Sequence, residues 1–273
     1  MDHHVYRRAD LLAHGYRDRQ IRDALDAGVL HRVRSGWYAD RSADPEVVAA
    51  VRRGGALGCV SALSKHQVWV APGYPDLHVR AGKYSRSMAD GFCSGFGGPL
   101  PVTKAVDDVP LALMYAARCM TREHWIAAAD SVMNSRRISA DELRFRMGHI
   151  PSPVADWMRA CDARSQSGTE SIVRTRLRNR GFHVVVQPRI ESIGGYADLR
   201  IGRLLIECDS RLHHTSPENY RKDRRRDRKS LAGRWMTMRL TYDDVLFGWD
   251  EALADICTVT DAGRHRIRKV RPK

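Results

Sequence analysis

The sequence predicts an α+β chain of three domains: a winged helix-turn-helix, a small and mainly helical middle domain, and an α/β domain. Three patterns lead to this prediction. Two short helical stretches precede a basic β-hairpin, further helical stretches follow, and the last part alternates one helix with strands that end in acidic residues. We expect the domains to span residues 1–80, 81–152 and 153–273.

The first domain opens with helical patterns over residues 8–13 and 18–27. Gly15 and Gly28 follow them, and glycine is the usual residue at the left-handed end of a helix. The stretch 29–38 alternates around a Ser-Gly pair and is typical of a β-hairpin. Two short helices followed by a basic hairpin are the order of elements in a winged helix-turn-helix.

Polar side chains of the second helix and of the hairpin are the candidates for contact with DNA. Such side chains read base edges in the major groove or bind phosphates. The alternative is that some of them only pack within the protein. The candidate residues here are Arg17, Arg19, Gln20, Arg22, Arg32 and Arg34.

The middle domain shows helical patterns and no chemistry. Residues 91–99 are rich in glycine and are expected to form a loop. Helical patterns then cover residues 109–119 and 122–133, and a third helix begins at Ser139 with a capping box. The prolines within residues 151–153 mark the boundary to the third domain, which opens with a helix predicted over residues 154–164.

The third domain combines one helix with three predicted strands. The helix covers residues 170–180 with Thr169 as its N-cap, and a strand follows over residues 182–187. Residues 196–201 and 204–209 are two further strands, joined by a tight turn at Gly202-Arg203.

Acidic residues gather at one end of this predicted hairpin, namely Asp198, Glu207 and Asp209. Mg²⁺ prefers oxygen ligands, usually one or two carboxylates with waters, and Mn²⁺ accepts the same donors. Asp198 and Glu207 are placed to share one ion, and the backbone carbonyl of Cys208 can add an oxygen. Glu207 and Asp209 point to the same face of a strand, where like charges repel without a cation or proton between them. The alternative is that these acids only pair with nearby arginines.

A longer set of residues carries a resemblance to a known family. The set includes Gly168-Thr169-Glu170-Ser171, Tyr196-Ala197-Asp198, Ile206-Glu207-Cys208-Asp209 with the following His213, and Met238-Arg239-Leu240. In order and spacing, residues 168–246 resemble the DUF559 family, a branch of the PD-(D/E)XK nuclease superfamily related to very-short-patch (Vsr-like) mismatch repair endonucleases. The resemblance implies a mixed sheet with flanking helices and a Mg²⁺-dependent site for phosphodiester hydrolysis in DNA.

The resemblance also implies roles for individual residues. The catalytic set would be Glu170, Asp198, Glu207, Asp209 and His213, with His213 assisting the attacking water or the leaving group. Two departures bear on activity: Asp209 stands where the wider superfamily has lysine, and Ser210 stands where the family often has glycine. Arg221 or Lys222 from the next helix is a candidate for the missing positive charge.

The first two domains resemble the winged helix and the helical domain of AbiEi-type antitoxins, which act as transcriptional repressors. The wing sequence Gly-Val-Leu-His-Arg-Val-Arg-Ser-Gly-Trp-Tyr, residues 28–38, carries most of this resemblance. It implies an alternative function: a repressor or type IV antitoxin-like protein whose nuclease fold is inactive. A role in phage defence, in repair or in toxin–antitoxin control stays open, and so does a homodimer.

The net charge agrees with a nucleic-acid partner. The chain has 46 Lys and Arg against 32 Asp and Glu, a formal net charge of +14. Basic side chains that neutralise phosphates release counterions, so DNA is the expected partner. The helix that spans residues 221–229 adds Arg221, Arg224 and Arg225 as candidate DNA contacts; alternatively, it is a solvated face whose arginines pair with Asp223 and Asp227.

The remaining composition concerns compartment and cysteines. Residues 1–10 lack the apolar core of a signal peptide and no run of about 18 apolar residues occurs, so we expect a cytoplasmic protein without a membrane segment. The six cysteines form no Cys-x-x-Cys pair. This argues against a zinc ribbon and a disulfide framework, and predicts that most cysteines are small core residues.

Overall fold

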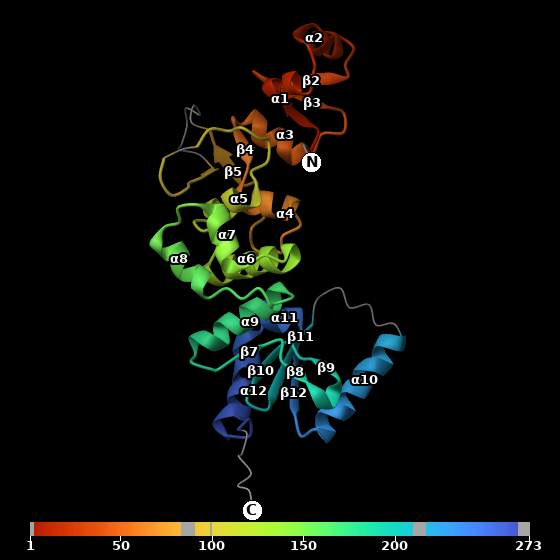
Figure 1. The fold of residues 1–273 in the computed structure, drawn as a ribbon, viewed down its shortest axis with the longest axis vertical. Coiled ribbons are helices and arrows are strands. Elements are labelled where there is room, and N and C mark those ends of the chain that lie inside the picture. The colour runs from red at the N-terminus through yellow and green to blue at the C-terminus, as the bar shows by residue number, and fades with distance from the viewer. Residues whose placement is uncertain (1–2, 83–90, 99, 210–216, 267–273) are drawn as a thin grey trace, which may run out of the picture. The chain divides into compact units, whose positions relative to one another are not determined.

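The computed structural model describes residues 3–82, 91–98, 100–209 and 217–266. It is a mixed α/β protein with mixed sheets (Figure 1). The chain divides into two compact units, an N-terminal unit of Met1–Trp125 with Asp141–Arg159 and a C-terminal unit of Ile126–Ala140 with Ala160–Lys273. Within the described ranges, every helix is too short or too polar to cross a membrane.

The N-terminal unit contains the two short helices and the hairpin that the sequence predicts. They are α1 (Arg8–Ala13), α2 (Asp18–Asp26), β2 (Leu30–Arg34) and β3 (Trp37–Asp40). A further strand, β1 (Val5–Arg7), pairs with β3 to complete an antiparallel sheet in the order β1-β3-β2. Gly15 and Gly28 adopt φ angles of +90° and +67°, which only glycine reaches at no steric cost, and so end the two helices as predicted.

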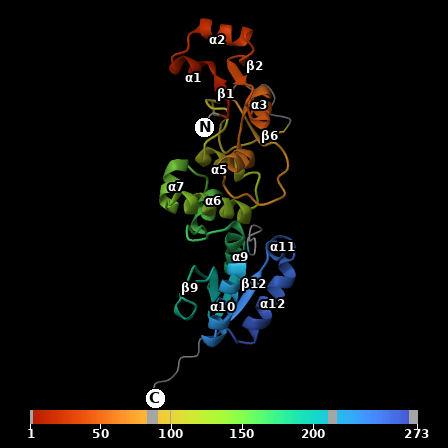
Figure 2. The same cartoon turned by 90° about the vertical axis from the view of Figure 1, so that its right-hand side faces the viewer.

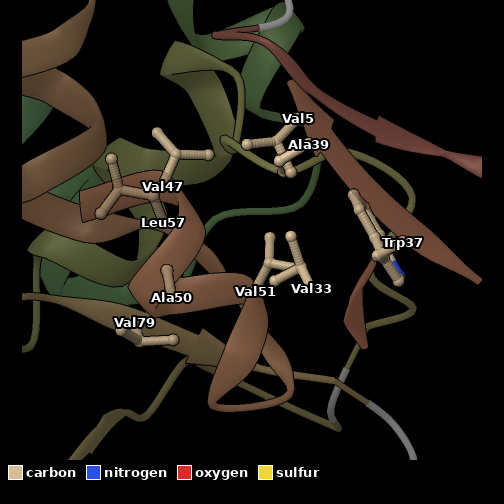
Figure 3. Close-up of a cluster of buried hydrophobic side chains, with 10 residues drawn as sticks. Val5, Val33, Trp37, Ala39, Val47, Ala50, Val51, Leu57 and Val79 are labelled. Carbon is tan, nitrogen blue, oxygen red and sulfur yellow. The ribbon is translucent and has the colours of Figure 1, made fainter. Parts of the chain in front are cut away.

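Helix α3 (Pro45–Arg52) closes the first core of this unit. The Asp44 carboxylate accepts from the backbone N–H groups of Glu46 and Val47, and a proline occupies the first turn. Val33 of the hairpin and Val51 of α3 lie side by side in a buried cluster that also holds residues of the next sheet (Figure 3). Burial of these apolar side chains holds the hairpin against α3.

A second sheet follows in the order β4-β5-β6 and, unlike the first, is mixed. It is formed by β4 (Gly55–Leu57), β5 (Val79–Ala81) and β6 (Phe92–Cys93) and is accompanied by α4 (Cys59–Lys65) and α5 (Val109–Ala116). Strand β6 lies inside the stretch 91–99 that we predicted to be loop, and that prediction is wrong there, because the glycines flank two residues that pair in parallel with β5.

Helices α6 (Arg122–Arg136), α7 (Ala140–Met147) and α8 (Ser152–Arg159) follow α5. The starts of α6 and α7 agree with the predicted helices. The helix predicted over residues 154–164 instead ends at Arg159, and Asp162 lies in the turn beyond it, where its side chain accepts from the backbone N–H of Arg164. The predicted domain boundaries at 80/81 and 152/153 stay predictions.

The C-terminal unit contains a four-stranded sheet in the order β12-β11-β10-β7. Helices flank this sheet, which Figures 1 and 2 show from two sides. Strands β10 and β11 pair antiparallel, whereas β11 and β12 pair parallel. The elements of this unit are α9 (Gly168–Asn179), β7 (Val185–Val186), β8 (Arg189–Ile190), a 3-10 turn η1 (Glu191–Ile193), β9 (Gly195–Tyr196), β10 (Leu199–Ile201), β11 (Leu204–Cys208), α10 (Pro217–Ala232), β12 (Met236–Leu240), α11 (Tyr242–Leu246) and α12 (Trp249–Asp261).

Three local predictions in this unit are wrong in detail. Ser167, not Thr169, caps α9, since its hydroxyl accepts from the Glu170 N–H. The strand predicted over 182–187 shrinks to β7, because Gln187 has a left-handed φ of +49° that ends regular pairing. The strand predicted over 196–201 is split into β9 and β10, and Asp198 lies in the gap.

Candidate metal centre

Asp198 is held at the point where three segments of the C-terminal unit meet. The pairing of β10 with β11 matches Leu199 with Ile206, so Asp198 lies one step beyond the ladder, opposite Glu207. Its Oδ2 accepts from the Cys208 N–H at 2.8 Å, and its backbone carbonyl accepts from the Gln187 N–H at 2.8 Å. The carboxylate therefore replaces a backbone partner at the end of β11, which fixes its direction.

Glu170 reaches the same place from the first turn of α9. Its residue is 4% exposed, and its Oε2 accepts from the Gln166 N–H and from Gln187 Nε2, each at 3.0 Å. Gln187 Nε2 also lies 3.3 Å from Oδ1 of Asp198. One amide group therefore joins two buried carboxylates, and it belongs to a residue whose left-handed backbone is of the kind that clusters at functional sites.

Glu207 is the third member of this acidic cluster. Its side chain is 16% exposed, and its Oε1 lies 3.1 Å from Nη2 of Arg226 on α10. The same guanidinium donates to the carbonyl of Tyr196 at 2.6 Å. Arg226 was not among the predicted site residues, and its guanidinium brings a positive charge next to Glu207.

The pKa values of the three carboxyl groups reflect this crowding. Burial, and then the charge of Asp198, raise the pKa of Glu170 and of Glu207 to about 7. Burial also raises the pKa of Asp198, against the hydrogen bonds from Cys208 and Gln187 and the charge of Arg226, which lower it. Several buried carboxyl groups with raised pKa values in one place are a pattern typical of metal and catalytic sites.

The remaining predicted ligands are placed as follows. Asp209 directly follows β11; its N–H donates to the Leu240 carbonyl at 2.9 Å, and its charge contributes to the raised pKa of Asp198. Cys208 is buried, with its backbone N–H bound to Asp198. His213 and Ser210 lie outside the described residues.

The donor set fits a hard cation, with one restriction. Among the described residues, no three acidic side chains bring ligand oxygens within 4.8 Å of one another. A single ion held directly by three carboxylates therefore does not fit this arrangement. Mg²⁺ usually takes one or two carboxylates and keeps several waters, so at most two of these acids can be direct ligands of one ion here.

Helix α9, which carries Glu170, is anchored by a fully buried ion pair. Arg174 of α9 donates to Asp130 of α6 at 2.8 Å, and the two side chains are 0% and 1% exposed. Asp130 also accepts from the Ser171 hydroxyl at 2.7 Å and from the Asp162 N–H at 2.8 Å. This network fixes the rotation of α9, so that Glu170 faces Gln187.

The side chains predicted to contact DNA in the N-terminal unit differ in how exposed they are and in whether they already contact the protein. Arg17, Arg19, Arg22 and Arg32 are exposed. The side-chain oxygen of Gln20, although exposed, accepts from the Arg17 N–H and so caps α2. Arg34 is partly buried with its guanidinium over the Trp37 ring at 5.4 Å, and it contributes more to packing than the exposed arginines do.

On α10 the side chains of Arg221, Arg224 and Arg225 are exposed. Arg224 lies 3.7 Å from Asp227, and Asp227 also accepts from Arg239 of β12 at 2.6 Å. The basic helix thus pairs part of its charge within the protein, as the alternative interpretation expected. The side chains of Lys222 and Asp223 lie outside the described set.

A second group of potential ligands was missed by the sequence reasoning. Cys59, His78, Cys93 and Cys119 of the N-terminal unit bring one donor atom each to within 4.8 Å of the others. The hydrogen bond with Cys119 raises the pKa of Cys93 to about 12, while bonds from Cys59 and Cys93 lower the pKa of Cys119. The four residues have no short-range spacing, so their meeting was not visible in the sequence.

Comparison with models of protein families, with curated proteins and with solved structures finds no significant match to this chain.

Proposed function

We propose that this protein is a Mg²⁺-dependent DNA endonuclease, active also with Mn²⁺, whose acidic cluster binds the metal. The observation that carries the proposal is the cluster of Glu170, Asp198 and Glu207, which are joined by Gln187 and the end of β11 and have raised pKa values. Glu170 and Asp198 are buried acids that form no ion pair with any described residue, and such acids favour a site built for a cation.

In this proposal Asp198 and Glu207 are the metal ligands. Glu170 acts through Gln187, holding the amide that orients Asp198. A bound Mg²⁺ would stabilise charge on the scissile phosphate and lower the pKa of an attacking water. Arg226, beside Glu207, supplies a cation where the PD-(D/E)XK superfamily has the lysine that Asp209 replaces here.

The N-terminal unit would bind the DNA. The exposed arginines of helix α2 and of hairpin strand β2 support the winged-helix interpretation and the resemblance to AbiEi-type antitoxins. The mixed sheet β12-β11-β10-β7 with its helices supports the resemblance of the C-terminal unit to DUF559 nucleases.

A second candidate function is a DNA-binding repressor or antitoxin-like protein with an inactive nuclease fold. Two observations favour it: Asp209 stands in place of the lysine, and the Glu207 carboxylate is already paired with Arg226. A repressor would use the same basic surface and would need no metal.

Plasmid cleavage by Asp198→Asn, compared with wild type, tests both candidates. Supercoiled plasmid is incubated with Mg²⁺ or Mn²⁺, and a gel shift on the same DNA without divalent metal measures binding. The endonuclease proposal expects nicking by wild type, no nicking by Asp198→Asn, and equal gel shifts. The control is Asp255→Asn on α12, an exposed acid that should change neither result.

Nicking by Asp198→Asn at the wild-type rate would show that the acidic cluster is not the active site. A wild-type protein that shifts DNA but nicks with neither metal would favour the repressor.

A further inference from the structure

Three thiols and one imidazole converge in the N-terminal unit, far from any residue of the acidic cluster in the sequence. The donor atoms of Cys59, His78, Cys93 and Cys119 all lie within 4.8 Å of one another, and Nδ1 of His78 is 3.2 Å from Sγ of Cys93. We propose that these four residues, here the Cys/His cluster, bind one structural Zn²⁺ ion. The proposal is independent of the nuclease activity.

The donor chemistry selects zinc. Three sulfurs and one ring nitrogen form one of the common ligand sets of structural zinc sites, with Zn–S near about 2.3 Å and Zn–N near about 2.0 Å. Donors around one tetrahedral ion at these lengths lie roughly 3.5 to 3.8 Å apart. The donor atoms lie no more than 4.8 Å apart and the His78–Cys93 contact is 3.2 Å, values on either side of that spacing, so small side-chain adjustments complete the site. Magnesium prefers oxygen donors and would not compete.

The backbone holds three of the ligands close together. The His78 carbonyl accepts from the Gly58 N–H at 3.0 Å, and the His78 N–H donates to the Ser61 hydroxyl at 3.0 Å, which ties His78 to the first turn of α4. Cys59 is the first residue of that turn. Cys93 is placed by the parallel pairing of β6 with β5, where it stands opposite Arg80.

Cys119 comes from the turn that ends α5, and its N–H donates to the Ala116 carbonyl at 3.0 Å. The four ligands thus belong to four separate places in the chain: the start of α4, the residue before β5, strand β6 and the end of α5. A metal here would cross-link both helices to the sheet. Cross-linking of this kind is what structural zinc does in small domains with limited cores.

The backbone at Cys59 adds an independent observation. Its φ is +50°, in the left-handed region that residues with a Cβ rarely adopt, although it opens a helix. Such strain persists where the surroundings require it and clusters at functional sites. Here it sets the direction in which the fully buried Cys59 side chain leaves the chain, and the other three ligands lie in that direction.

All four tetrahedral positions are filled by protein side chains. Catalytic zinc sites keep one position for water or substrate, whereas structural sites are closed. Cys59 is 0% exposed, and the other three ligands are partly buried. The site is therefore assigned a structural role in the N-terminal unit and no reaction.

Metal analysis of the purified full-length protein tests the proposal. Protein expressed in medium supplemented with zinc should contain about one Zn²⁺ per chain, measured by elemental mass spectrometry. Titration of its thiols with an organomercurial should release that zinc to a colorimetric chelator. Metal-free protein should bind Co²⁺ with the visible absorption of a tetrahedral site and the near-ultraviolet band of thiolate ligation.

Single substitutions show whether zinc loss comes from removal of a ligand or from a general loss of folding. Cys93→Ser and His78→Ala should lose most of the zinc, whereas His78→Cys should keep it, because a four-cysteine set also binds zinc. Cys257→Ser on α12 is the matched control, since this free cysteine lies outside the cluster, and it should retain the wild-type zinc content. Asp198→Asn should also retain it, which separates this site from the proposed nuclease centre.

Several outcomes would overturn the proposal. They are a wild-type protein that holds no zinc and binds no Co²⁺, iron in place of zinc, a disulfide between two cluster cysteines in the non-reduced protein, and equal zinc loss in Cys257→Ser. Zinc retention in Cys93→Ser would do so as well.

Discussion

The acidic cluster of the C-terminal unit and the Cys/His cluster of the N-terminal unit differ in the chemistry of their donor atoms. They also differ in whether protein side chains can fill every ligand position of a metal ion. The first consists of oxygen donors whose charges repel one another and raise their own pKa values. The second consists of three sulfur donors and one nitrogen donor that lie within 4.8 Å of one another, enough for a complete tetrahedral set. Hard donors with open positions suit a cation that must admit water and substrate, and soft donors in a closed set suit one that only holds the fold.

Both clusters stand beside a buried arginine–aspartate pair. Arg80 donates to Asp107 at 2.7 Å, and each side chain is 2% exposed; Arg80 also stands opposite Cys93 in the sheet. Arg174 donates to Asp130 at 2.8 Å next to the helix of Glu170. A buried pair fixes geometry because removing one partner leaves an uncompensated charge. Each unit thus has a rigid ionic support under its potential metal ligands.

The largest expected effect is a loss of DNA cleavage that leaves the zinc content unchanged, which would show that the two clusters act separately. Glu207→Gln should lower divalent-dependent DNA cleavage on the order of 10³-fold, the upper range for loss of one charge-stabilising group. Zinc content should stay unchanged. Cleavage rates and elemental analysis of the same preparation measure both, and Glu251→Gln, an exposed acid of α12, is the control. If Glu207→Gln lost zinc as well as cleavage activity, the two clusters would not be independent sites.

The next largest effect is expected on stability, from the buried ion pair that supports the acidic cluster. Arg174→Met removes the partner of buried Asp130 and should lower the free energy of unfolding by about 3 kcal/mol. Arg146→Ala, which breaks an ion pair whose side chains are 46% and 44% exposed, should cost less than about 1 kcal/mol. Denaturant titration compares the two variants. Equal stability of Arg174→Met and wild type would show that the buried pair is dispensable.

A pH dependence of stability is expected from the raised pKa values of the acidic cluster. Folding raises the pKa of Glu170 and Glu207 from 4.5 to about 7, so the folded state binds protons more tightly than the unfolded state. In metal-free protein the free energy of unfolding should therefore fall as pH rises from about 4.5 through about 7. Denaturant titrations in chelator from pH 5 to pH 8 measure this.

Added Mg²⁺ should restore part of the lost stability at pH 8, and Glu207→Gln should flatten the curve. A stability that rises over this range would contradict the assignment of these two carboxyl groups.

A smaller effect is expected from Gln187, as a positioning residue. Gln187→Ala removes the amide shared by Glu170 and Asp198 and should lower cleavage roughly 10- to 100-fold, as loss of groups that orient metal ligands does. The Mg²⁺ concentration for half-maximal rate should rise as well. Gln166→Ala is the control, because Gln166 bonds Glu170 through its backbone N–H. An unchanged Mg²⁺ dependence would limit Gln187 to a structural role.

The smallest effect concerns DNA binding by the N-terminal unit. Arg22→Ala should weaken DNA binding several-fold at every sequence and reduce the slope of log affinity against log salt by about 1. Cleavage per bound complex should stay at the wild-type value. Fluorescence anisotropy at several salt concentrations gives the slope, and Arg159→Ala on α8 serves as control. No change in slope would exclude Arg22 from phosphate contact.

The sequence predicted the local elements where short-range rules apply. Gly15 and Gly28 ended the first helices at the expected places, because glycine adopts a positive φ without the steric cost that a Cβ brings. The hairpin of Asp198 and Glu207 was likewise predictable, because two strands joined by Gly202-Arg203 can pair only in a narrow range of registers. The gap in the strand at Asp198 was not, since it follows from hydrogen bonds to Gln187 and Cys208 on other segments.

Only the tertiary structure decided which distant residues meet. Arg226 reaches Glu207 from a helix whose arginines look alike in the sequence, and burial and register chose among them. Gln187 lay within a predicted strand, and its left-handed backbone became visible only in the fold. The sequence by itself determined the acidic hairpin and the order of the first two helices and the hairpin after them, because these depend on neighbours in the chain. It could not bring Cys59 and Cys119 together, because that contact depends on packing between helices sixty residues apart in the chain.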